Sequence, residues 1–561
     1  MRNRKQILCL FVAATCLAAS LITTARAQEV ESTLRQQVEQ YLKASESVYN
    51  FTGSAAIAKG GKIIYAGGFG MADFEAKRKN APTTRFLIGS VTKQFTAAAI
   101  LQMQEKGLLS VDDTLKKYFS DFPENIANTV TIRHLLTHTS GIANYTASTA
   151  FATWLKTNPS LDDQIAMIAT LPPDFAPGER YQYSNSGYKL LEGIIVKISG
   201  MPWDQYMAKN ILAPAGLSAT GFDLMQVEED LRAVGYTTPD SIRQRAEMWP
   251  PGVAGGAGAL YSTTLDLIKW DEALRTKKLL SAASLAAMYT PNLDRYAFGW
   301  IIDSVGAYER IWHDGQIAGF AAALVRIPSE ELCIAVLSND DTGPARSLAI
   351  ALSALAVGQP YDVPVRKTPV AGNPDRYPEY VGAYDLGGGQ YRFITTENGK
   401  LYSQRAGSPQ FEILPEGGDK FFYPMDNATT VLFIRNEAGE VMAQEFQQGG
   451  VDSRHRKLPP DEAEKVMPKF EVAQVDPAIY DQYVGEYQLA PIFSIVITRE
   501  GNQIFGQATG QSKFEMFPSS ETKFFLKVVE AQIEFVRGAD GKVEQLILYQ
   551  SGQVMPGKKI K

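Results

Sequence analysis

The stretch Phe86-Leu87-Ile88-Gly89-Ser90-Val91-Thr92-Lys93, which runs directly into Gln94–Met103, decides how the rest of the chain is read. An extended apolar run ends at Gly89, and good helix formers follow as far as a glycine stop. Ser90 therefore opens a predicted helix, and Lys93 lies about one turn further along the same face. A serine hydroxyl beside an amine, at a helix N-terminus whose free N–H groups can stabilise an oxyanion, suits a nucleophile.

Ser-x-x-Lys is a short pattern, and the chain carries it three times, at Ser90/Lys93, Ser186/Lys189 and Ser520/Lys523. A match to such a short motif carries little weight alone, because many matches arise by chance. The sequence around each pair has to decide which one is catalytic.

The first 27 residues have the composition of a secretory signal peptide. Its basic part, apolar part and cleavage site are Arg2, Arg4 and Lys5, the run Ile7–Ile22, and Ala25-Arg26-Ala27. We expect a signal peptide over 1–27, a mature start at Gln28, and a periplasmic or secreted protein. An uncleaved anchor or a lipidated Cys16 is the alternative, disfavoured because Thr15 fits poorly before a lipidated cysteine.

The net charge limits the kinds of binding partner, and the cysteine content limits the possible disulfides. Removal of the leader takes four positive charges from a chain of net charge −6, which leaves −10 and argues against nucleic acid or an anionic membrane surface. Of three cysteines, Cys333 alone lies outside the leader, within the apolar run Leu332–Leu337. We expect a buried thiol, no intrachain disulfide and no membrane span after signal removal.

The length of 561 residues predicts about three domains. The first is expected over 28–360, with a helix from Val30 to Leu42, a hairpin near each end and helices between the hairpins. The predicted elements of the two hairpins and the final helix are Ala55–Lys59 with Lys62–Ala66, Gly319–Ile327 with Glu331–Ser338, and Ala345–Ala356. This order favours an α+β domain whose terminal strands meet in one antiparallel sheet.

Two histidines lie in a segment, 131–141, that predicts a helix ending at Gly141. His134 and His138 would lie one turn apart, as in a metal-binding pair. There is no Glu between them and no obvious third ligand, so we favour packing and hydrogen bonding over zinc. We predict no metal and no organic cofactor.

Beyond a Pro-rich linker over 361–376, the chain repeats itself. Tyr377–Tyr384 returns as Tyr480–Tyr487 and Phe411–Pro415 as Phe514–Pro518, both at the same offset, and Phe433 pairs with Phe535 after a single deletion. Short alternating segments separated by turns such as Asn398-Gly399 predict strands. We expect two small antiparallel β-barrels over 377–460 and 477–561, joined by a linker over 461–476.

Two further motifs occur once each: Tyr183-Ser184-Asn185, and His313-Asp314-Gly315 followed by Gln316. With Ser90-Val91-Thr92-Lys93 before them, the chain resembles the serine β-lactamase and penicillin-recognising family from Gln28 to about Gly358. The resemblance implies a β-lactamase/transpeptidase-like domain and makes Ser90 the nucleophile. It leaves Ser186/Lys189 structural, since that pair overlaps the tyrosine motif, while Ser520/Lys523 falls on a turn of the second repeat. Gly-x-Ser-x-Gly is absent, which excludes an α/β-hydrolase elbow.

The resemblance also implies roles for the other motif residues. Tyr183 and Lys93 would share the proton of Ser90 as a coupled pair, and the residues alone do not say which is the base. Asn185 would hold Lys93 or a substrate amide, and the backbone N–H groups of Ser90 and Gln316 would form the oxyanion hole beside Gly315. The reaction would be acylation of Ser90 and then attack of water on the acyl-enzyme.

His313 stands where a β-lactamase has the lysine of Lys-Thr-Gly. A histidine is mostly neutral at pH 7, so the grip on a substrate carboxylate is weakened. His-x-Gly with two C-terminal lipocalin-like barrels resembles the D-aminopeptidase branch, which implies a D-aminopeptidase or D-amino-acid amidase. An esterase, a D,D-carboxypeptidase or a weak β-lactamase are alternatives, and a catalytically silent peptide- or glycan-binding protein is an alternative of another class.

The expected partner is a small peptide, amide or ester substrate. The repeats fit three roles that the residues do not separate: a lid over the site, the surface of a homodimer, or holders of a ligand. The resemblance implies the first, in which the barrels restrict access to the site.

Overall fold

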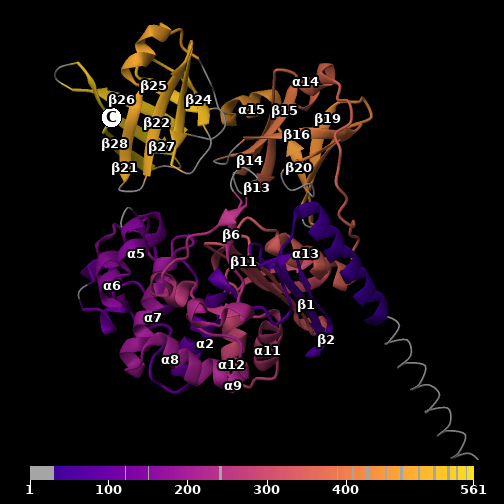
Figure 1. Cartoon of the computed structure of the whole chain (residues 1–561), viewed down its shortest axis with the longest axis vertical. Coiled ribbons are helices and arrows are strands. Elements are labelled where there is room, and N and C mark those ends of the chain that lie inside the picture. Colours follow the sequence, from indigo (N-terminus) through magenta and orange to yellow (C-terminus); the bar gives the residue numbers. More distant parts are fainter. Residues whose placement is uncertain are drawn as a thin grey trace, which may run out of the picture. The chain divides into compact units, whose positions relative to one another are not determined.

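The computed structural model describes residues 31–120, 122–148, 151–238, 243–387, 390–406, 410–424, 429–448, 451–467, 472–490, 493–509, 513–526, 531–538, 541–550 and 553–561. It contains two compact units (Figure 1). One unit comprises most of the chain up to Pro364, and the other comprises Val365–Lys561 with Asn144–Pro159 and Thr238–Gln244. The signal-peptide prediction lies outside the described residues.

The first unit is built on a six-stranded sheet in the order β2-β1-β12-β11-β10-β9, with every neighbouring pair antiparallel. Its strands are β1 (Gly53–Lys59), β2 (Lys62–Phe69), β9 (Ile301–Val305), β10 (Tyr308–Ile317), β11 (Phe320–Ile327) and β12 (Leu332–Ser338). Ala55 pairs with Val336, so the first and last strands of the domain meet in the middle of the sheet. This confirms the α+β prediction and both predicted hairpins.

Helices cover both faces of the sheet (Figure 1). On one face, α13 (Ala345–Ala356) and a helix over residues 31–49 pack against alternate strand residues. On the other, α11 (Thr264–Arg275) contacts β1 and β12. Since both faces are covered, every residue of β11 and β12 is buried, including Cys333, as predicted. Continuous apolar strands are the expected result of such burial.

The helical layer is centred on α2 (Thr92–Glu105), most of whose residues are buried. Phe95 of α2 stacks on Trp270 of α11 with ring centroids 4.0 Å apart, and the Trp270 indole donates to Gln94 Oε1 at 3.0 Å. The other helices are α3 (Glu124–Ala127), α4 (Ile132–Leu136), α5 (Phe151–Thr157), α6 (Leu161–Thr170), α7 (Asn185–Ser199), α8 (Trp203–Met207), α9 (Ala213–Ala215), α10 (Pro251–Ala254) and α12 (Ala282–Tyr289). The short strands are β3 (Met71–Asp73), β4 (Arg78–Lys79), β5 (Phe86–Leu87), β6 (Tyr236–Thr237), β7 (Gln244–Arg245) and β8 (Tyr261–Ser262).

The helix predicted to continue to Gly141 is wrong, because α4 ends at Leu136. Thr131 and His134 cap its N-terminus reciprocally, and His138 adopts a left-handed conformation with φ of +55°. The His138 carbonyl then accepts a hydrogen bond from Gln182 N, so the chain turns towards the tyrosine motif. The two histidines therefore do not form a helical metal-binding pair.

The second unit contains two closed, eight-stranded antiparallel barrels, as predicted. Barrel 1 consists of β13 (Gly382–Gly387), β14 (Gln390–Glu397), β15 (Lys400–Arg405), β16 (Gln410–Gly417), β17 (Lys420–Phe422), β18 (Thr430–Arg435), β19 (Val441–Gln448) and β20 (Val451–Lys457). Barrel 2 consists of β21 (Gly485–Ala490), β22 (Phe493–Glu500), β23 (Gln503–Ala508), β24 (Lys513–Pro518), β25 (Lys523–Leu526), β26 (Ala531–Arg537), β27 (Val543–Gln550) and β28 (Gln553–Lys559).

Residues that repeat in the sequence make corresponding contacts in the two barrels. Tyr384 donates its hydroxyl to the Tyr380 carbonyl at 2.7 Å, and Tyr487 donates to the Tyr483 carbonyl at 2.8 Å. The Tyr380 ring stacks on Phe433 at 4.4 Å and the Tyr483 ring on Phe535 at 4.1 Å. Each barrel is thus filled at corresponding positions by the same aromatic cluster.

The ends of barrel 1 carry short helices. α14 (Tyr377–Tyr380) precedes β13, and α15 (Pro460–Val466) follows β20. The stretch predicted as a linker, 461–476, therefore opens with a helix, whose Ala463 packs against Ala383 and Phe393. Proline and acidic residues at its start are typical of a helix N-terminus.

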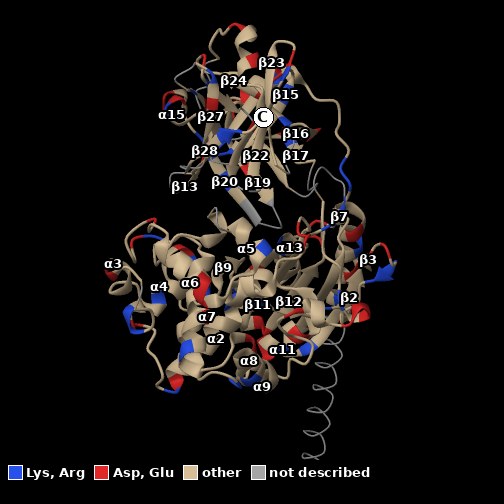
Figure 2. Ribbon diagram, turned by 60° about the vertical axis from the view of Figure 1, so that its left-hand side comes forward, with Lys and Arg blue, Asp and Glu red and all other residues tan. Residues whose placement is uncertain are grey.

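Basic and acidic residues are interspersed over the described chain (Figure 2). No described helix is long and apolar enough to cross a bilayer. Within the same residues, no group of three His, Cys, Asp or Glu side chains could hold a metal ion.

Candidate active site

Ser90 lies in a single 3-10 turn, Gly89–Val91, that leads directly into α2. The strand before it, β5, pairs with β8 through Phe86 and Ser262. This short ladder and the buried body of α2 hold the turn from both sides. Ser90 is therefore fixed at the entrance of the central helix, as the sequence predicts.

Two glycines allow β10 to lie directly against this turn. A Cβ atom at Gly315 would lie 2.0 Å from the Ile88 carbonyl oxygen and 2.8 Å from Ser90 N. A Cβ atom at Gly89, whose φ is +49°, would lie 2.8 Å from Gln316 N. Contacts this short exclude any side chain, so glycine is required at both positions. The backbone amides of Ser90 and Gln316 both lie at this contact, while the Gln316 side chain donates to the Asp341 carbonyl at 2.7 Å.

The Ser-x-x-Lys and Tyr-x-Asn motifs converge on one hydroxyl. Tyr183 Oη lies 2.7 Å from Ser90 Oγ, and Lys93 Nζ lies 3.0 Å from the same oxygen. Lys93 Nζ also lies 2.8 Å from Asn185 Oδ1 and 2.7 Å from the Ala257 carbonyl oxygen. Asn185 begins α7, so the tyrosine motif occupies the N-terminus of a second helix.

Lys93 is fully buried, with its Nζ 4.8 Å from the ring centroid of Tyr183 and 5.4 Å from that of Tyr188. Burial holds the pKa of Lys93 well below its usual range, although the charge of Asp314 acts in the opposite direction. The oxygens of Ser90, Asn185 and Ala257 match the three donors of an ammonium. With one proton lost, the amine would still donate to Asn185 and Ala257, and its lone pair would face Ser90 Oγ.

His313 is 2% exposed and forms two hydrogen bonds. Its Nε2 lies 2.8 Å from the Tyr296 hydroxyl, and its Nδ1 contacts the carbonyl of Asp314. Burial lowers the pKa of His313 to about 4, with Asp314 opposing and Lys93 contributing. The ring is therefore neutral at pH 7, and the third motif supplies no fixed cation.

Sequence reasoning missed an aromatic cluster behind the nucleophile. His138 lies at its centre, with its ring centroid 4.2 Å from Tyr183, 5.3 Å from Tyr188 and 4.6 Å from Tyr296. Its Nδ1 accepts a hydrogen bond from Ser184 N at 3.3 Å. Burial holds the pKa of His138 well below its usual range, so it packs as a neutral ring. Its nearness to Tyr183 depends on the tertiary fold, and no local spacing marks it.

The other two Ser-x-x-Lys pairs are structural. Lys189 forms a buried ion pair with Glu192 at 2.9 Å and donates to the Gly252 carbonyl at 2.8 Å. Glu192 in turn accepts from Gly256 N at 2.8 Å, so this pair braces the segment that presents Ala257 to Lys93. In barrel 2, Ser520 Oγ accepts from Lys523 N at 3.0 Å within a turn.

This fold and this arrangement of side chains are those of serine hydrolases related to β-lactamases. The family model described as Beta-lactamase matches residues 34–358, and the chain belongs to this family. A second model, described as a domain of unknown function (DUF3471), matches residues 470–559, which include barrel 2.

Similar proteins and solved structures agree with this family assignment. Penicillin-binding protein 4* of Bacillus subtilis (strain 168) is 31% identical over 418 residues, which are 69% of this chain and 91% of that protein. The structure of the octameric penicillin-binding protein homologue from Pyrococcus abyssi matches with a TM-score of 0.56 at 25% identity, over 75% of this chain and 98% of that one. The penicillin-binding protein from Bacillus halodurans matches with a TM-score of 0.50 at 28% identity, over 56% and 99%.

Proposed function

We propose that this chain is an exported serine hydrolase that forms an acyl-enzyme on Ser90 and acts as a D-aminopeptidase or D-amino-acid amidase. The observation that carries the chemistry is the pair of contacts at Ser90 Oγ, 2.7 Å to the Tyr183 hydroxyl and 3.0 Å to Lys93 Nζ. These are the distances expected between a nucleophile and the groups that move its proton.

The proposed acylation step uses neutral Lys93 as the base. As Ser90 Oγ attacks the substrate carbonyl, its proton passes to Lys93 Nζ, and the oxyanion is held by the backbone N–H groups of Ser90 and Gln316. The proton then returns to the leaving nitrogen, with the Tyr183 hydroxyl as the nearest relay. Water attacks the acyl-enzyme by the same steps in reverse and releases the acid.

The electrostatics support a substrate with a free amine. His313 is neutral, so nothing at the third motif replaces the lysine that grips a β-lactam carboxylate. The charge of Asp314 raises the pKa of Lys93, in opposition to burial, and the pKa of Tyr181 is raised first by burial and then by the charges of Asp294 and Asp314. These carboxylates favour a substrate ammonium over a substrate carboxylate, although Arg346, whose Nη1 lies 3.8 Å from Asp314 Oδ2, offsets part of the charge of Asp314.

A second candidate is a penicillin-reactive D,D-peptidase. The relation to penicillin-binding protein 4* over 91% of that protein's length favours it. An esterase uses the same Ser90, Lys93 and Tyr183 and remains the third alternative.

The first test is hydrolysis of D-alanine p-nitroanilide beside its L-isomer and its N-acetylated form. We expect turnover of the free-amine D-substrate alone, lost in Ser90→Ala. Ser520→Ala, which alters another Ser-x-x-Lys pair, is the matched control and should retain full activity. Labelling by a fluorescent penicillin or turnover of a D-alanyl-D-alanine terminus, with no turnover of the anilide, would instead support the second candidate.

A further inference from the structure

The interior of barrel 1 carries a buried arginine that has no part in the reaction at Ser90. Arg392 lies on β14 and is 8% exposed. Its Nη1 donates to the Tyr423 hydroxyl at 2.6 Å and to Ser403 Oγ at 3.2 Å, and its guanidinium carbon lies 3.8 Å from the ring centroid of Phe446. β14 is adjacent neither to β17, which Tyr423 follows, nor to β19, which carries Phe446. These contacts therefore cross the inside of the barrel.

The charge of Arg392 has no carboxylate partner within the described part of the chain. Among the residues that the structure describes, no carboxylate forms an ion pair with it, and its buried Nε has no hydrogen-bond partner. Burial accordingly lowers the pKa of Arg392. A buried cation without an anion is strongly unfavourable, and proteins usually avoid it.

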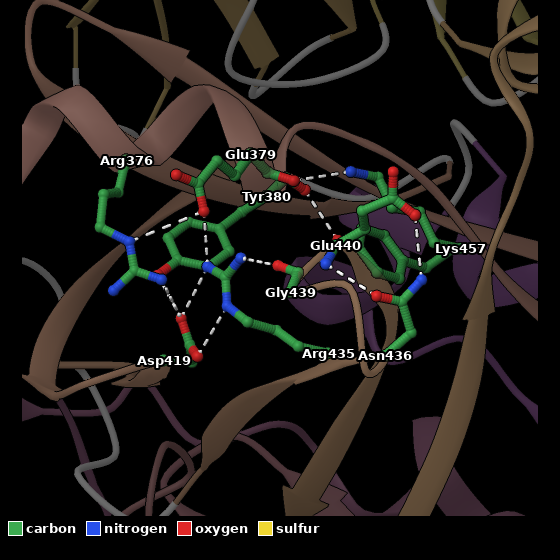
Figure 3. A network of polar contacts seen from close by, with 10 residues as sticks. Arg376, Glu379, Tyr380, Asp419, Arg435, Asn436, Gly439, Glu440 and Lys457 are labelled. Carbon is green, nitrogen blue, oxygen red and sulfur yellow. Dashed lines mark hydrogen bonds and ion pairs between the residues drawn. The ribbon is translucent and has the colours of Figure 1, made fainter.

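Another arginine of the same barrel shows the usual arrangement (Figure 3). Arg435 meets Asp419 at 2.9 Å and Glu379 at 2.7 Å, and it donates to the Gly439 carbonyl at 2.6 Å. Its charge is paired within the protein. Among the described residues, Arg392 lacks the carboxylate partners that Arg435 has.

A second unsatisfied atom lies in the same cluster. Gln444 Nε2 lies 3.2 Å from His455 Nδ1, whereas the buried Gln444 Oε1 has no partner within the described residues. The His455 ring is 6.2 Å from Phe446, the residue that stacks on Arg392. Burial and then the charge of Arg392 lower the pKa of His455, while the charge of Asp385 acts in the opposite direction. Arg392 Nε and Gln444 Oε1 are thus an unpaired donor and an unpaired acceptor on two residues linked through Phe446 and His455.

Barrel 2 serves as an internal comparison. At the repeat offset, the residues that correspond to Arg392, Ser403, Tyr423, Gln444, Phe446 and His455 are Ile495, Gly506, Leu526, Leu546, Leu548 and Gly557. The isoleucine and the leucines are buried and pack in one apolar cluster. The barrel fold is therefore complete without any polar group at these positions, so folding alone does not require the polar cluster of barrel 1.

We propose that barrel 1 binds a small organic carboxylate that also carries an N–H group. The carboxylate pairs with the Arg392 guanidinium, and the N–H donates to the Gln444 carbonyl. The rings of Phe446 and Tyr423 contact the body of the ligand. N-acylated amino acids and the C-terminal residue of a peptide have this chemistry.

The test uses the full chain carrying Ser90→Ala, so that no ligand is consumed. Isothermal titration calorimetry compares N-acetylglycine with N-acetylglycinamide, which lacks the charge, and with inorganic phosphate. We expect saturable binding of N-acetylglycine, and binding of the amide at least about tenfold weaker, as for loss of a charged hydrogen bond. Equal or tighter binding of phosphate would overturn the proposal in favour of an inorganic anion, and no binding by N-acetylglycine at millimolar concentration would also overturn it.

Substitutions in barrel 1 test whether N-acetylglycine binds there. Arg392→Met should abolish it and should not lower the melting temperature, because an uncompensated buried charge is removed. Arg454→Met, which removes a 57% exposed arginine from β20, is the matched control and should bind as before. Gln444→Leu introduces the residue found at the corresponding position of barrel 2. It should weaken the binding of N-acetylglycine and leave the binding of acetate unchanged. Undiminished binding of N-acetylglycine by both Arg392→Met and Gln444→Leu would contradict the assignment.

Discussion

Lys93 is the residue whose surroundings determine the chemistry at the site. Its amine lies beside two tyrosine rings, no described carboxylate forms an ion pair with it, and the charge of Asp314 acts on it only from a distance. A charged Lys93 would lower the pKa of Tyr183 and make the tyrosine the base, which is one of the two options that the sequence leaves open. Burial favours the other option, in which lysine is the base and tyrosine the relay.

Replacement of Lys93 should separate these options. Lys93→Ala removes a general base and should lower kcat by about 10²–10⁴-fold. Lys93→Arg keeps the positive charge but cannot lose a proton, so it should be as inactive as alanine if lysine is the base. Substantial activity in Lys93→Arg would show that the charge alone suffices. Lys523→Ala, at the exposed pair in barrel 2, is the matched control, and circular dichroism checks that each variant is folded.

His313 should remain neutral well into the acid range. Its pKa in the folded protein is about 4, below the ordinary value of 6.5. The unfolded chain therefore takes up this proton first, so the stabilising contribution is complete above pH 6.5 and is lost as the pH falls towards 4, by about 3 kcal/mol in all. With four histidines in the chain, ¹⁵N-histidine NMR can follow the titration, and His313→Gln identifies the signal. A midpoint near 6.5 would contradict the burial argument.

At the scale of elements, the proposed oxyanion site depends on the contact between the Ser90 turn and β10. The two amides come from different elements: Ser90 N belongs to the turn at the start of α2, and Gln316 N belongs to strand β10 of the sheet. The contact is close enough that glycine is needed on both sides. A local steric requirement thus fixes the distance between two elements from opposite parts of the domain.

Gly315→Ala should disrupt this contact. Its Cβ would lie 2.0 Å from the Ile88 carbonyl oxygen, so β10 must move away from Ser90. We expect kcat to fall by about 10²–10³-fold, as for loss of an oxyanion donor. Gly107→Ala is the control, since a Cβ there meets nothing within 4 Å although φ is +69°. Its melting temperature should fall slightly while its kcat stays unchanged, and equal losses of kcat in both variants would contradict the steric argument.

The sequence predicts those elements whose formation depends on residues close together in the chain. The two hairpins and α13 lie where alternation and helix formers place them, and the three motifs meet at Ser90 as their order indicates. The end of α4 was missed because His138 leaves the helix to pack among tyrosines from distant segments. The Ala257 carbonyl was missed for a related reason, since any residue offers a carbonyl and the fold alone brings this one to Lys93.

At the scale of the whole molecule, the predicted leader would decide in which compartment the enzyme meets its substrate. We expect cleavage after Ala27, so the exported protein should begin at Gln28. Intact-mass spectrometry of protein recovered from the periplasm or medium measures this directly. Replacement of Ala25 and Ala27 by bulky residues should leave the leader attached, and a full-length mass for the exported wild-type protein would contradict the assignment.

The pairing of β1 with β12 has a consequence for the timing of folding. Ala55 finds its partner, Val336, only after nearly the whole hydrolase domain has left the ribosome or crossed the membrane. Before that, β1 has β2 as its only sheet neighbour, and a two-stranded hairpin is marginally stable in water. Such long-range closure slows folding, so under the proposed export the chain would still be unfolded, and suitable for threading through a secretion channel, until its last strand arrives.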